Sequence, residues 1–429
     1  GDESMSRLFA GASRTSVSPL SPVPLAGFAN RDRYGYTAVD SGISVRCFYL
    51  RDGTMKEALV VCSDLLCYDS ELAAAFKIAI RNRTGIPGDA VILHATHNHS
   101  GPSVRDFIGI WRVDPDYVNY LLNQILSGAL AAKERAVEVT VERGIGVCTL
   151  GANRRKPLEG KIELAYNPDG PADPELNVIR FKGNDGSVIA AWIHYTCHPV
   201  VNADNRLSSE FCGAAVERLE RQLGETAVVG YLQGCCGDIN PYWPGDTKGY
   251  AAIVELGNRL ADDAECVMKS AMKPVPCFGV DVRRATAELP FARLPTTEEL
   301  ECARHSGIGY QRLWADYLLR RPDLLKPSAT LDLTLLTLSD GLSLLFMNGE
   351  MVVRYGLFVR ELSAGAALPV AYTNGMIGYV TTAAQLSEGG YEPVESVTYF
   401  GLPAPFDVRT ESIVLREFEK MLLPRGLRH

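Results

Sequence analysis

Residues 91 to 102 read Val-Ile-Leu-His-Ala-Thr-His-Asn-His-Ser-Gly-Pro, an apolar run that ends in a His-x-His motif. The run from Val91 to Leu93 is typical of a buried strand, and Gly101-Pro102 ends it. If the segment stays extended past the strand, side chains two residues apart face the same side. We therefore expect His97 and His99 to point at one ion or one substrate. Two core histidines with ordinary hydrogen bonds are an equally good interpretation, because two ligands do not make a zinc site.

Outward from this segment, apolar strand patterns alternate with helical patterns along the chain, which is typical of α/β proteins. Strands are predicted at 91–93, 188–192, 228–232, 342–347 and 370–373, and helices at 69–83, 117–136, 210–223, 251–272 and 352–362. The segments 160–174 and 403–405 contain Pro and Gly and are predicted to be loops. We see no internal repeat. A single catalytic domain over residues 5–429 is expected, with 296–325 as a small helical excursion.

Several of the predicted strands end abruptly in polar or ionisable residues. These strand ends are His97 to Ser100, Cys197-His198, Gly237-Asp238 and Asn348 to Glu350. In open α/β sheets, ligands bind in the crevice beyond the carboxyl ends of the strands. We therefore expect four strands to bring chemical groups to one rim.

Histidines and one acid along this rim are candidates for metal ligands. Five of the seven histidines lie in two short segments, as His94, His97 and His99, then His194 and His198. A catalytic zinc takes three protein ligands and keeps one open position, so a carboxylate ligand should come from elsewhere. Glu350 is the best placed acid, although on its own it is better explained as a helix N-terminal carboxylate. Tyr379 on its own is a half-buried tyrosine.

Taken together, these segments resemble the neutral/alkaline, non-lysosomal ceramidase family. The matching segments are Thr96 to Pro102, His198-Pro199, Ser208 to Gly213, Gly349-Glu350, Tyr379 to Thr382 and Gly389 to Glu392. They occur in the family's order, from about Ser16 to Tyr391. The resemblance implies the fold of the family's catalytic domain, a layered α/β sandwich of mixed β-sheets flanked by helices.

The resemblance also implies a zinc site and a substrate site. Carried over residue by residue, zinc is held by His97, His198, Glu350 and Tyr379, and His99 and Arg154 line the substrate site. A tyrosine ligand needs a nearby cation to lower its pKa from about 10, and zinc supplies one.

The sequence departs from the family at two places. The family carries a serine in Gly-Asp-x-Ser-Pro, whereas this chain reads Gly237-Asp238-Ile239-Asn240-Pro241. An amide side chain can donate to an oxyanion, but it is neither a nucleophile nor a base. The chain is also expected to hold the catalytic domain alone, without the family's C-terminal β-sandwich domain. Both departures place ceramide itself in doubt as the substrate.

The predicted function is that of a zinc-dependent hydrolase of an amide (N-acyl) bond, on a small-molecule or lipid-like substrate in lipid metabolism. Zinc polarises the carbonyl and lowers the pKa of a bound water to about 7. His99 serves as general acid or base, and Arg154 and Asn240 steady an oxyanion or a substrate carboxylate. Asp238 shares an anion-facing loop with Asn240, or else only caps a helix. Candidates for an apolar acyl pocket are Trp111, Trp192, Tyr242 and Trp243, although such aromatic residues are more often core.

Three alternatives remain open from the sequence. The chain could bind a metal and a ligand without catalysis, which Asn240 favours and the full set of ligand residues opposes. It could be a true ceramidase or an ester hydrolase. It could also be a sheet-rich scaffold without metal, in which case the five clustered histidines would hold no ion. The oligomeric state and the native divalent metal stay open.

Composition narrows the class of protein. The chain has 429 residues, 46% hydrophobic and 22% charged, and a net charge of −8, which argues against a nucleic-acid partner. No apolar run is long enough for a transmembrane helix. Eleven cysteines without framework spacing fit reduced thiols, so the cytoplasm is expected, or the periplasm or exterior if a signal peptide has been removed. Residues 1–4 are expected to be an addition to a natural chain that starts at Met5.

Overall fold

The computed structural model describes residues 7–31, 34–276 and 279–423, so the expected start at Met5 lies outside the described residues. Its largest sheet has nine strands in the order β12-β10-β9-β6-β1-β3-β4-β5, with β14 paired to β6. The bounds are β1 Leu8–Ser16, β3 Ser44–Asp52, β4 Glu57–Ser63, β5 Val91–Ala95, β6 Val137–Val147, β9 Glu175–Gly183, β10 Val188–Tyr195, β12 Val228–Gln233 and β14 Lys273–Val275.

The two halves of this sheet repeat one architecture. In the first half β1, β3 and β4 pair antiparallel and β4 pairs parallel with β5. In the second half β6, β9 and β10 pair antiparallel and β10 pairs parallel with β12. A crossover helix joins each parallel pair, and a further helix follows each half. These helices are α1 Ser70–Thr84 and α2 Pro115–Glu134, then α3 Glu210–Leu223 and α4 Gly249–Ser270. The repetition lies in the architecture, since none is visible in the sequence.

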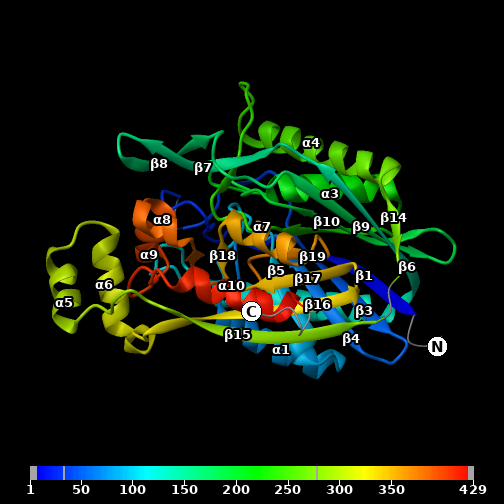
Figure 1. Ribbon diagram of the computed structural model, residues 1–429, viewed down its shortest axis with the longest axis horizontal. Coiled ribbons are helices and arrows are strands. Elements are labelled where there is room, and N and C mark those ends of the chain that lie inside the picture. Colours follow the sequence, from blue (N-terminus) through cyan, green and yellow to red (C-terminus); the bar gives the residue numbers. More distant parts are fainter. Residues whose placement is uncertain (1–6, 32–33, 277–278, 424–429) are drawn as a thin grey trace.

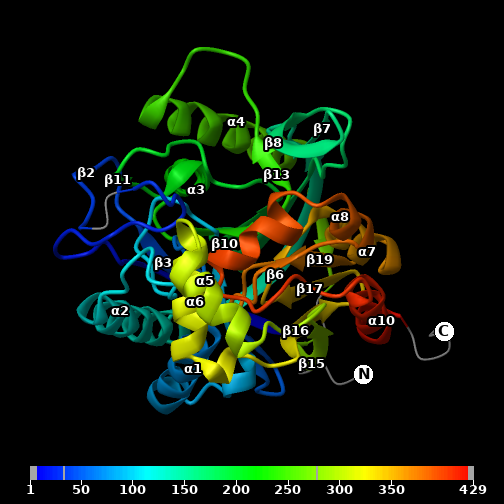
Figure 2. The same ribbon diagram turned by 90° about the vertical axis from the view of Figure 1, so that its left-hand side faces the viewer.

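The two halves fold onto each other with the helices outside. Helix α2 packs on β1 and β3, and α4 packs on β6 and β9, so helices cover opposite sides of the strands (Figures 1 and 2). Between the halves, the rings of Phe48 and Trp192 meet edge to face at 5.8 Å. A Cβ at Gly230 would lie 2.7 Å from the ring of Phe48, so only glycine fits there. The two outer strands of the sheet, β5 and β12, therefore lie side by side. The backbone amide of Gln233 in β12 donates to Nε2 of His94 in β5 at 3.0 Å.

A second core surrounds a four-stranded sheet, β15-β16-β17-β19, which packs against α7 and α10. Their bounds are β15 Asp281–Pro290, β16 Ser328–Ser339, β17 Leu342–Met347, β19 Ala367–Val370, α7 Val353–Leu362 and α10 Thr410–Leu422. There are also three small sheets, with the strand orders β13-β7-β8, β11-β2 and β18-β20. The remaining elements are β2 Ala38–Val39, β7 Gly151–Leu158, β8 Lys161–Asn167, β11 Arg206–Leu207, β13 Ile239–Pro241, β18 Glu350–Met351, β20 Tyr379–Val380, α8 Ala383–Glu388, a π-helical turn Tyr391–Glu395 and α9 Ser396–Tyr399.

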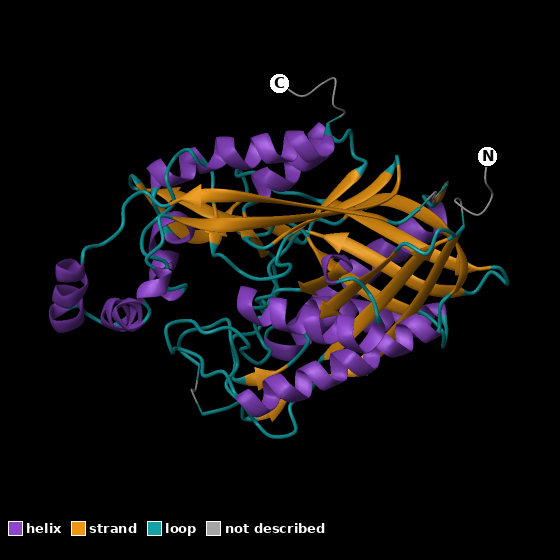
Figure 3. Ribbon diagram, turned by 90° about the horizontal axis from the view of Figure 1, so that it is seen from below, coloured by secondary structure: helices purple, strands orange, loops and turns teal. Residues whose placement is uncertain are grey.

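The predicted α/β class and its mixed, helix-flanked sheets are confirmed, with two local corrections (Figure 3). The strand predicted at 370–373 ends at Val370, because Tyr372 and Asn374 adopt positive φ values of 55° and 65°. The loop predicted at 160–174 contains strand β8, which pairs with β7 at the edge of a small sheet. β8 is mostly exposed, so it lacks the apolar signal of a buried strand.

The segment predicted as a helical excursion forms two helices, α5 Thr297–Ser306 and α6 Tyr310–Arg320, at one end of the molecule (Figure 1). Gly309, with a φ of 61°, lies at the break between them. Trp314 of α6 donates from Nε1 to the carbonyl of Leu402 at 2.7 Å. Within the described ranges, no helix is long and apolar enough to cross a membrane, and the ten cysteines there are free thiols.

Candidate active site

Three side chains from three different strand ends meet at one point. His97 follows β5, His198 follows β10 and Glu350 follows β17. Oε2 of Glu350 lies 2.8 Å from Nε2 of His97 and 3.0 Å from Nε2 of His198. The two imidazole Nε2 atoms lie 3.1 Å apart. The fourth predicted strand end joins them, because the amide of Gly237 donates to the carbonyl of Met351 at 2.9 Å. The expected rim is therefore confirmed.

The geometry of the His-x-His segment differs from the prediction. His97 has a φ of 71°, in the left-handed region, so the segment does not stay extended past β5. Histidine is one of the few residues that tolerate this region. The buried side chain of Asn98 fixes the turn by donating to the carbonyls of Asp64 and Ser208. His97 and His99 still come together, with ring centroids 4.6 Å apart and nearly perpendicular, but through a turn rather than through strand alternation.

Backbone carbonyls determine which nitrogen of each ring carries a proton. Nδ1 of His97 lies 2.9 Å from the carbonyl of Leu66, and Nδ1 of His198 lies 2.6 Å from that of Cys236. A carbonyl only accepts, so both Nδ1 atoms must carry the proton. Both Nε2 atoms then present lone pairs toward each other and toward Glu350. Burial, and next the charge of Arg154, lower the pKa of His198 to about 4, so this ring is neutral at pH 7.

This donor set fits a divalent metal ion. With both rings neutral, two imidazole lone pairs and a carboxylate oxygen point at one another, which is unfavourable unless a metal ion or a proton lies among them. Zinc bonds of about 2.1 Å to nitrogen and oxygen would place such ligand atoms roughly 3.4 Å apart, close to the separations found here. His99 also lies within reach, because ligand atoms of His97, His99 and His198 fall within 4.8 Å of one another. The distances favour Glu350 over His99 as the third ligand.

His99 is held at its Nδ1 and left without a partner at its Nε2. Nδ1 lies 3.0 Å from the carbonyl of Gly27, which fixes the tautomer. Gly27 has a φ of 112°, and a Cβ there would collide with the imidazole at 2.6 Å, so glycine is required. Nε2 is buried and makes no hydrogen bond in the structure. Burial, and next His97, lower the pKa of His99 well below its usual value, so the neutral ring is favoured.

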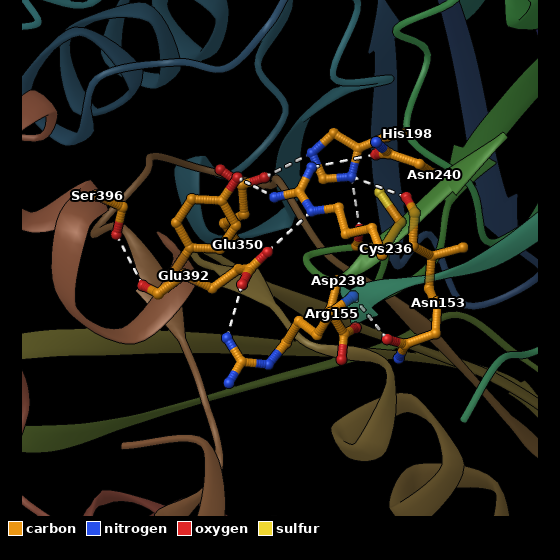
Figure 4. Close-up of polar contacts among 12 residues, drawn as sticks. Asn153, Arg155, His198, Cys236, Asp238, Asn240, Glu350, Glu392 and Ser396 are labelled. Carbon is orange, nitrogen blue, oxygen red and sulfur yellow. Dashed lines mark hydrogen bonds and ion pairs between the residues drawn. The ribbon is translucent and has the colours of Figure 1, made fainter. Parts of the chain in front are cut away.

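Arg154 of β7 connects two of the other expected site residues with a buried acid. Its Nη2 donates to the hydroxyl of Tyr379 at 2.7 Å, and its Nη1 donates to Oδ1 of Asn240 at 3.1 Å. Its Nε donates to Glu392 at 2.9 Å, and Glu392 also accepts from Arg155 at 2.8 Å (Figure 4). The sequence indicated Glu392 only as part of a family-like stretch and did not reveal this role.

Asp238 lies beside this group, but its carboxylate is committed elsewhere. One oxygen accepts from the amide of Val353 at 2.8 Å, at the first residue of α7, and the other accepts from Gln385 at 3.1 Å. The carboxylate at the N-terminus of α7 is thus Asp238, whereas the carboxylate of Glu350 faces the histidines. The backbone carbonyl of Asp238 accepts from the amide of Arg154 at 2.9 Å, so Asp238 links α7 to β7.

Tyr379 and Tyr372 lie on two sides of Glu350. Tyr379 pairs with Glu350 across the parallel strands β18 and β20. Tyr372, which the sequence did not single out, stacks on the ring of His97 with centroids 4.1 Å apart. Its hydroxyl donates to Oε2 of Glu350 at 3.3 Å and lies 3.1 Å from the thiol of Cys236. Tyr372 follows a buried strand and its ring fits the apolar pattern of a core residue. Its contact with Glu350 is therefore visible only in the folded structure.

Replacing Tyr372 by phenylalanine is expected to weaken metal binding about tenfold, because the hydrogen bond that orients a ligating carboxylate is lost while the stacking ring remains. Competition with a chromogenic chelator measures the affinity. Tyr355→Phe is the matched control, since it removes a buried hydroxyl that donates to the carbonyl of Thr381, away from the histidines. An affinity equal to that of the wild type would mean that Tyr372 only packs.

A cavity of about 200 Å³ opens beside these residues. His97, His99, Glu350 and Tyr379 form its polar wall, and most of the remaining wall is aromatic or aliphatic. Of the expected aromatic candidates, Trp111 lines this cavity, whereas Trp192 is fully buried in the core and Tyr242 is partly exposed and stacks on Tyr166.

The other two clustered histidines lie in the core. Nε2 of His94 accepts from the amide of Gln233 at 3.0 Å, and Nε2 of His194 lies 2.6 Å from the carbonyl of Pro369. Both rings are fully buried, and burial lowers the pKa of each to about 3. These two clustered histidines are therefore core residues with ordinary hydrogen bonds rather than metal ligands.

Comparison with known proteins places the fold. No family model matches the sequence, and no curated protein matches it. Neutral ceramidase from Pseudomonas aeruginosa has a similar structure, with a TM-score of 0.74 at 17% sequence identity over 97% of this chain and 74% of that chain. A ceramidase complexed with C2 has a TM-score of 0.75 at 18% identity, over 97% and 75% of the two chains. The chain therefore has a neutral ceramidase-like fold.

Proposed function

We propose that this chain is a zinc-dependent hydrolase of N-acyl amide bonds. His97, His198, Glu350 and Tyr379 would hold the ion, and His99, Arg154 and Asn240 would act on the substrate. The ceramidase-like fold supports an amide as the substrate by analogy. The observation that carries the proposal is the convergence of two imidazole Nε2 atoms and the buried Glu350 carboxylate, 2.8 to 3.1 Å apart, beside a cavity that His97 and Glu350 line.

The ion would supply a Lewis acid and a bound water of lowered pKa. The chain's own residues would move the protons. Hydrolysis requires that water lose a proton and that the leaving nitrogen gain one. The unpaired Nε2 of His99 is the buried, neutral nitrogen on the cavity wall that can accept the first and deliver the second. Its Nδ1 stays bonded to the carbonyl of Gly27, which keeps the ring in one orientation during both transfers.

Arg154 would stabilise negative charge at two places. Toward Tyr379 it donates a hydrogen bond that favours the phenolate, although burial outweighs it and raises the pKa of Tyr379 well above its usual value without an ion. Toward Asn240 it holds the amide oxygen, so the NH2 group of that side chain remains for a developing oxyanion. For Asp238 we propose a positioning role, through the backbone of Arg154, rather than direct contact with substrate.

Replacing Asn240 by alanine is expected to lower kcat about a hundredfold, since removing one oxyanion donor costs at least that much. The measurement is steady-state turnover, with metal content determined in parallel. Metal content should stay at the wild-type level because Asn240 is not among the proposed ligands. Unchanged turnover would mean that Asn240 has no part in catalysis and only accepts a hydrogen bond from Arg154.

The proposal as a whole is tested by a substrate screen. The wild-type protein is offered pooled N-acyl amides and carboxylic esters before metal removal, after chelation, and after zinc is added back. Amide cleavage that disappears with the chelator and returns with zinc supports the proposal. Cleavage of esters alone would mean that the protein is an ester hydrolase. Turnover that is unchanged by the chelator would refute the role of the metal.

A second function, metal-dependent ligand recognition without catalysis, is favoured by one observation. The side-chain oxygen of Asn240, which the sequence resemblance aligns with the family serine, already accepts from Arg154. Stoichiometric metal and ligand binding without turnover across the screen would establish this alternative.

A further inference from the structure

The cavity beside the proposed metal site is small and mostly aromatic. Its volume of about 200 Å³ falls below the range of roughly 300 to 1,000 Å³ that is usual for drug-sized ligands. Besides Tyr379, the rings on its wall are Phe28, Phe107, Trp111, Tyr391, Tyr399 and Phe400. Among the residues that the structure describes, Glu350 is the only acid on the wall, and it already faces the histidines. The cavity is therefore suited to a compact, apolar group.

Arg105 stacks on two rings of the cavity wall. Its guanidinium carbon is 4.6 Å from the ring centroid of Phe107 and 5.3 Å from that of Phe400. It donates to the carbonyls of Asp106 and Phe400. Among the described residues no carboxylate lies within ion-pair distance of Arg105.

Two further arginines stack on other rings of the wall. The guanidinium of Arg31 lies 4.7 Å from the centroid of Phe28, and that of Arg154 lies 5.7 Å from those of both Tyr379 and Tyr391. Arg31 also donates to backbone carbonyls, including that of His99, and in the described part of the chain it has no carboxylate partner at ion-pair distance. Five of the seven rings therefore already carry a cation beside them.

This arrangement decides which side of an amide enters the cavity. A ring that already faces a guanidinium gains little from a second cation. Within the described ranges, two of the three guanidinium groups, those of Arg31 and Arg105, have no carboxylate at ion-pair distance. The amine released by amide hydrolysis is a cation at neutral pH, so the cavity disfavours it. The acyl side is neutral before cleavage and a carboxylate afterwards. The acyl group is thus the part that fits.

Packed rings separate this cavity from a second, neighbouring one. Phe107 packs edge to face on Trp111 at 4.8 Å and on Phe400 at 5.4 Å. Nε1 of Trp111 donates to the carbonyl of Phe28 at 3.1 Å, which fixes that ring. Phe400 lines this cavity and also the neighbouring one of about 300 Å³. Its side chain is therefore a partition between the two.

We propose that the cavity accepts a short or aromatic acyl group without positive charge, and that Phe400 limits its length. This inference rests on the proposed amide hydrolysis and names its substrate class. Long acyl chains are excluded because the partition closes the cavity before they can be buried. Without the Phe400 ring the two cavities join, and longer chains gain room.

The experiment measures binding of the acyl products, so that it does not depend on turnover. Zinc-loaded protein is titrated calorimetrically with hexanoate, phenylacetate, dodecanoate and 6-(trimethylammonio)hexanoate. In the wild type we expect phenylacetate and hexanoate to bind, dodecanoate to bind no tighter than hexanoate, and the cationic acid to bind at least about tenfold more weakly. In Phe400→Ala we expect dodecanoate to bind at least tenfold tighter than hexanoate, since each buried methylene is worth about fourfold.

Two further variants keep the test decisive. Phe400→Leu retains an apolar side chain and serves if the alanine variant fails to fold; it should shift the preference in the same direction. Phe418→Ala removes a fully buried ring of α10 that lines neither cavity, and it should leave the order of affinities unchanged. Tighter binding of dodecanoate by the wild type, or equal binding of the cationic acid, overturns the inference. If the binding order is as expected but no amide is cleaved, only the proposed catalysis fails.

Discussion

His97→Ala is expected to abolish metal binding and amide hydrolysis together. The variant removes one of the two Nε2 atoms that face Glu350, and of the proposed ligands it leaves only His198, Glu350 and Tyr379. Loss of an outer hydrogen-bond partner alone weakens metal affinity about 10- to 100-fold, so loss of a ligand should exceed a hundredfold. Elemental mass spectrometry gives the metal content per chain, with about one zinc expected for the wild type and little for the variant.

Thermal unfolding gives an independent measure of the same change. Zinc at about a thousandfold above its Kd should stabilise the wild type by roughly 4 kcal/mol, and this increment should vanish in His97→Ala. His305→Ala is the matched control, because His305 is an exposed histidine of α5 outside the cluster. If the wild type takes up no metal even after zinc is offered and the excess removed, the proposed function fails and the likeness to ceramidases is one of fold alone.

Glu392→Gln is expected to lower the free energy of unfolding by about 3 to 5 kcal/mol, the usual cost of removing one partner from a buried ion pair. Glu392 is 1% exposed and accepts from both Arg154 and Arg155. Without its charge, both buried guanidinium groups lose their closest buried carboxylate. Chemical denaturation measures the loss. We also expect weaker turnover, because Arg154 is no longer held against Tyr379 and Asn240.

The pH dependence of stability distinguishes this ion pair from simple packing. Burial opposes ionisation of Glu392, but the charge of Arg154 and the hydrogen bond from Arg155 outweigh it and lower its pKa in the folded protein. A lowered pKa means that the stabilisation is present above the unfolded value of about 4.3 and is lost as the pH falls through the folded value. The wild type should therefore lose stability below about pH 4 more steeply than Glu392→Gln. Identical acid profiles would contradict the role of the charge.

Much of the site could be predicted because its signals are local. Apolar runs that end in His97, His198 and Glu350 mark strand ends by the pattern of a few consecutive residues. Helices α1 to α4 and α7 likewise follow from their periodicity, and their predicted ends differ from the observed ones by no more than a few residues. The weakly patterned β8 could not be predicted in this way, because an exposed edge strand carries no core-facing stripe.

Contacts between distant segments could not be predicted, because no local pattern encodes them. Tyr372 lies next to an apolar strand and reads as core, yet its hydroxyl donates to Glu350. For Asp238 the sequence left two interpretations open, an anion-facing loop or a helix cap, and its carboxylate accepts from the first amide of α7. In both cases the partner lies far away along the chain, so the role of the side chain depends on packing.

The sequence by itself determined the α/β class, the four polar strand ends and the candidate residues at them. Only the tertiary structure decided which of those residues meet. The nine-stranded sheet folds back on itself, so that its two outer edges, β5 and β12, lie together and bring His97 and His198 within 3.1 Å. That closure depends on helix packing and on the fit of Phe48 against Gly230. The physical reason is that hydrophobic periodicity is a local property, which indicates the buried face of a single helix or strand. Which two elements pack together depends instead on the complementary shapes of side chains that lie far apart in the sequence.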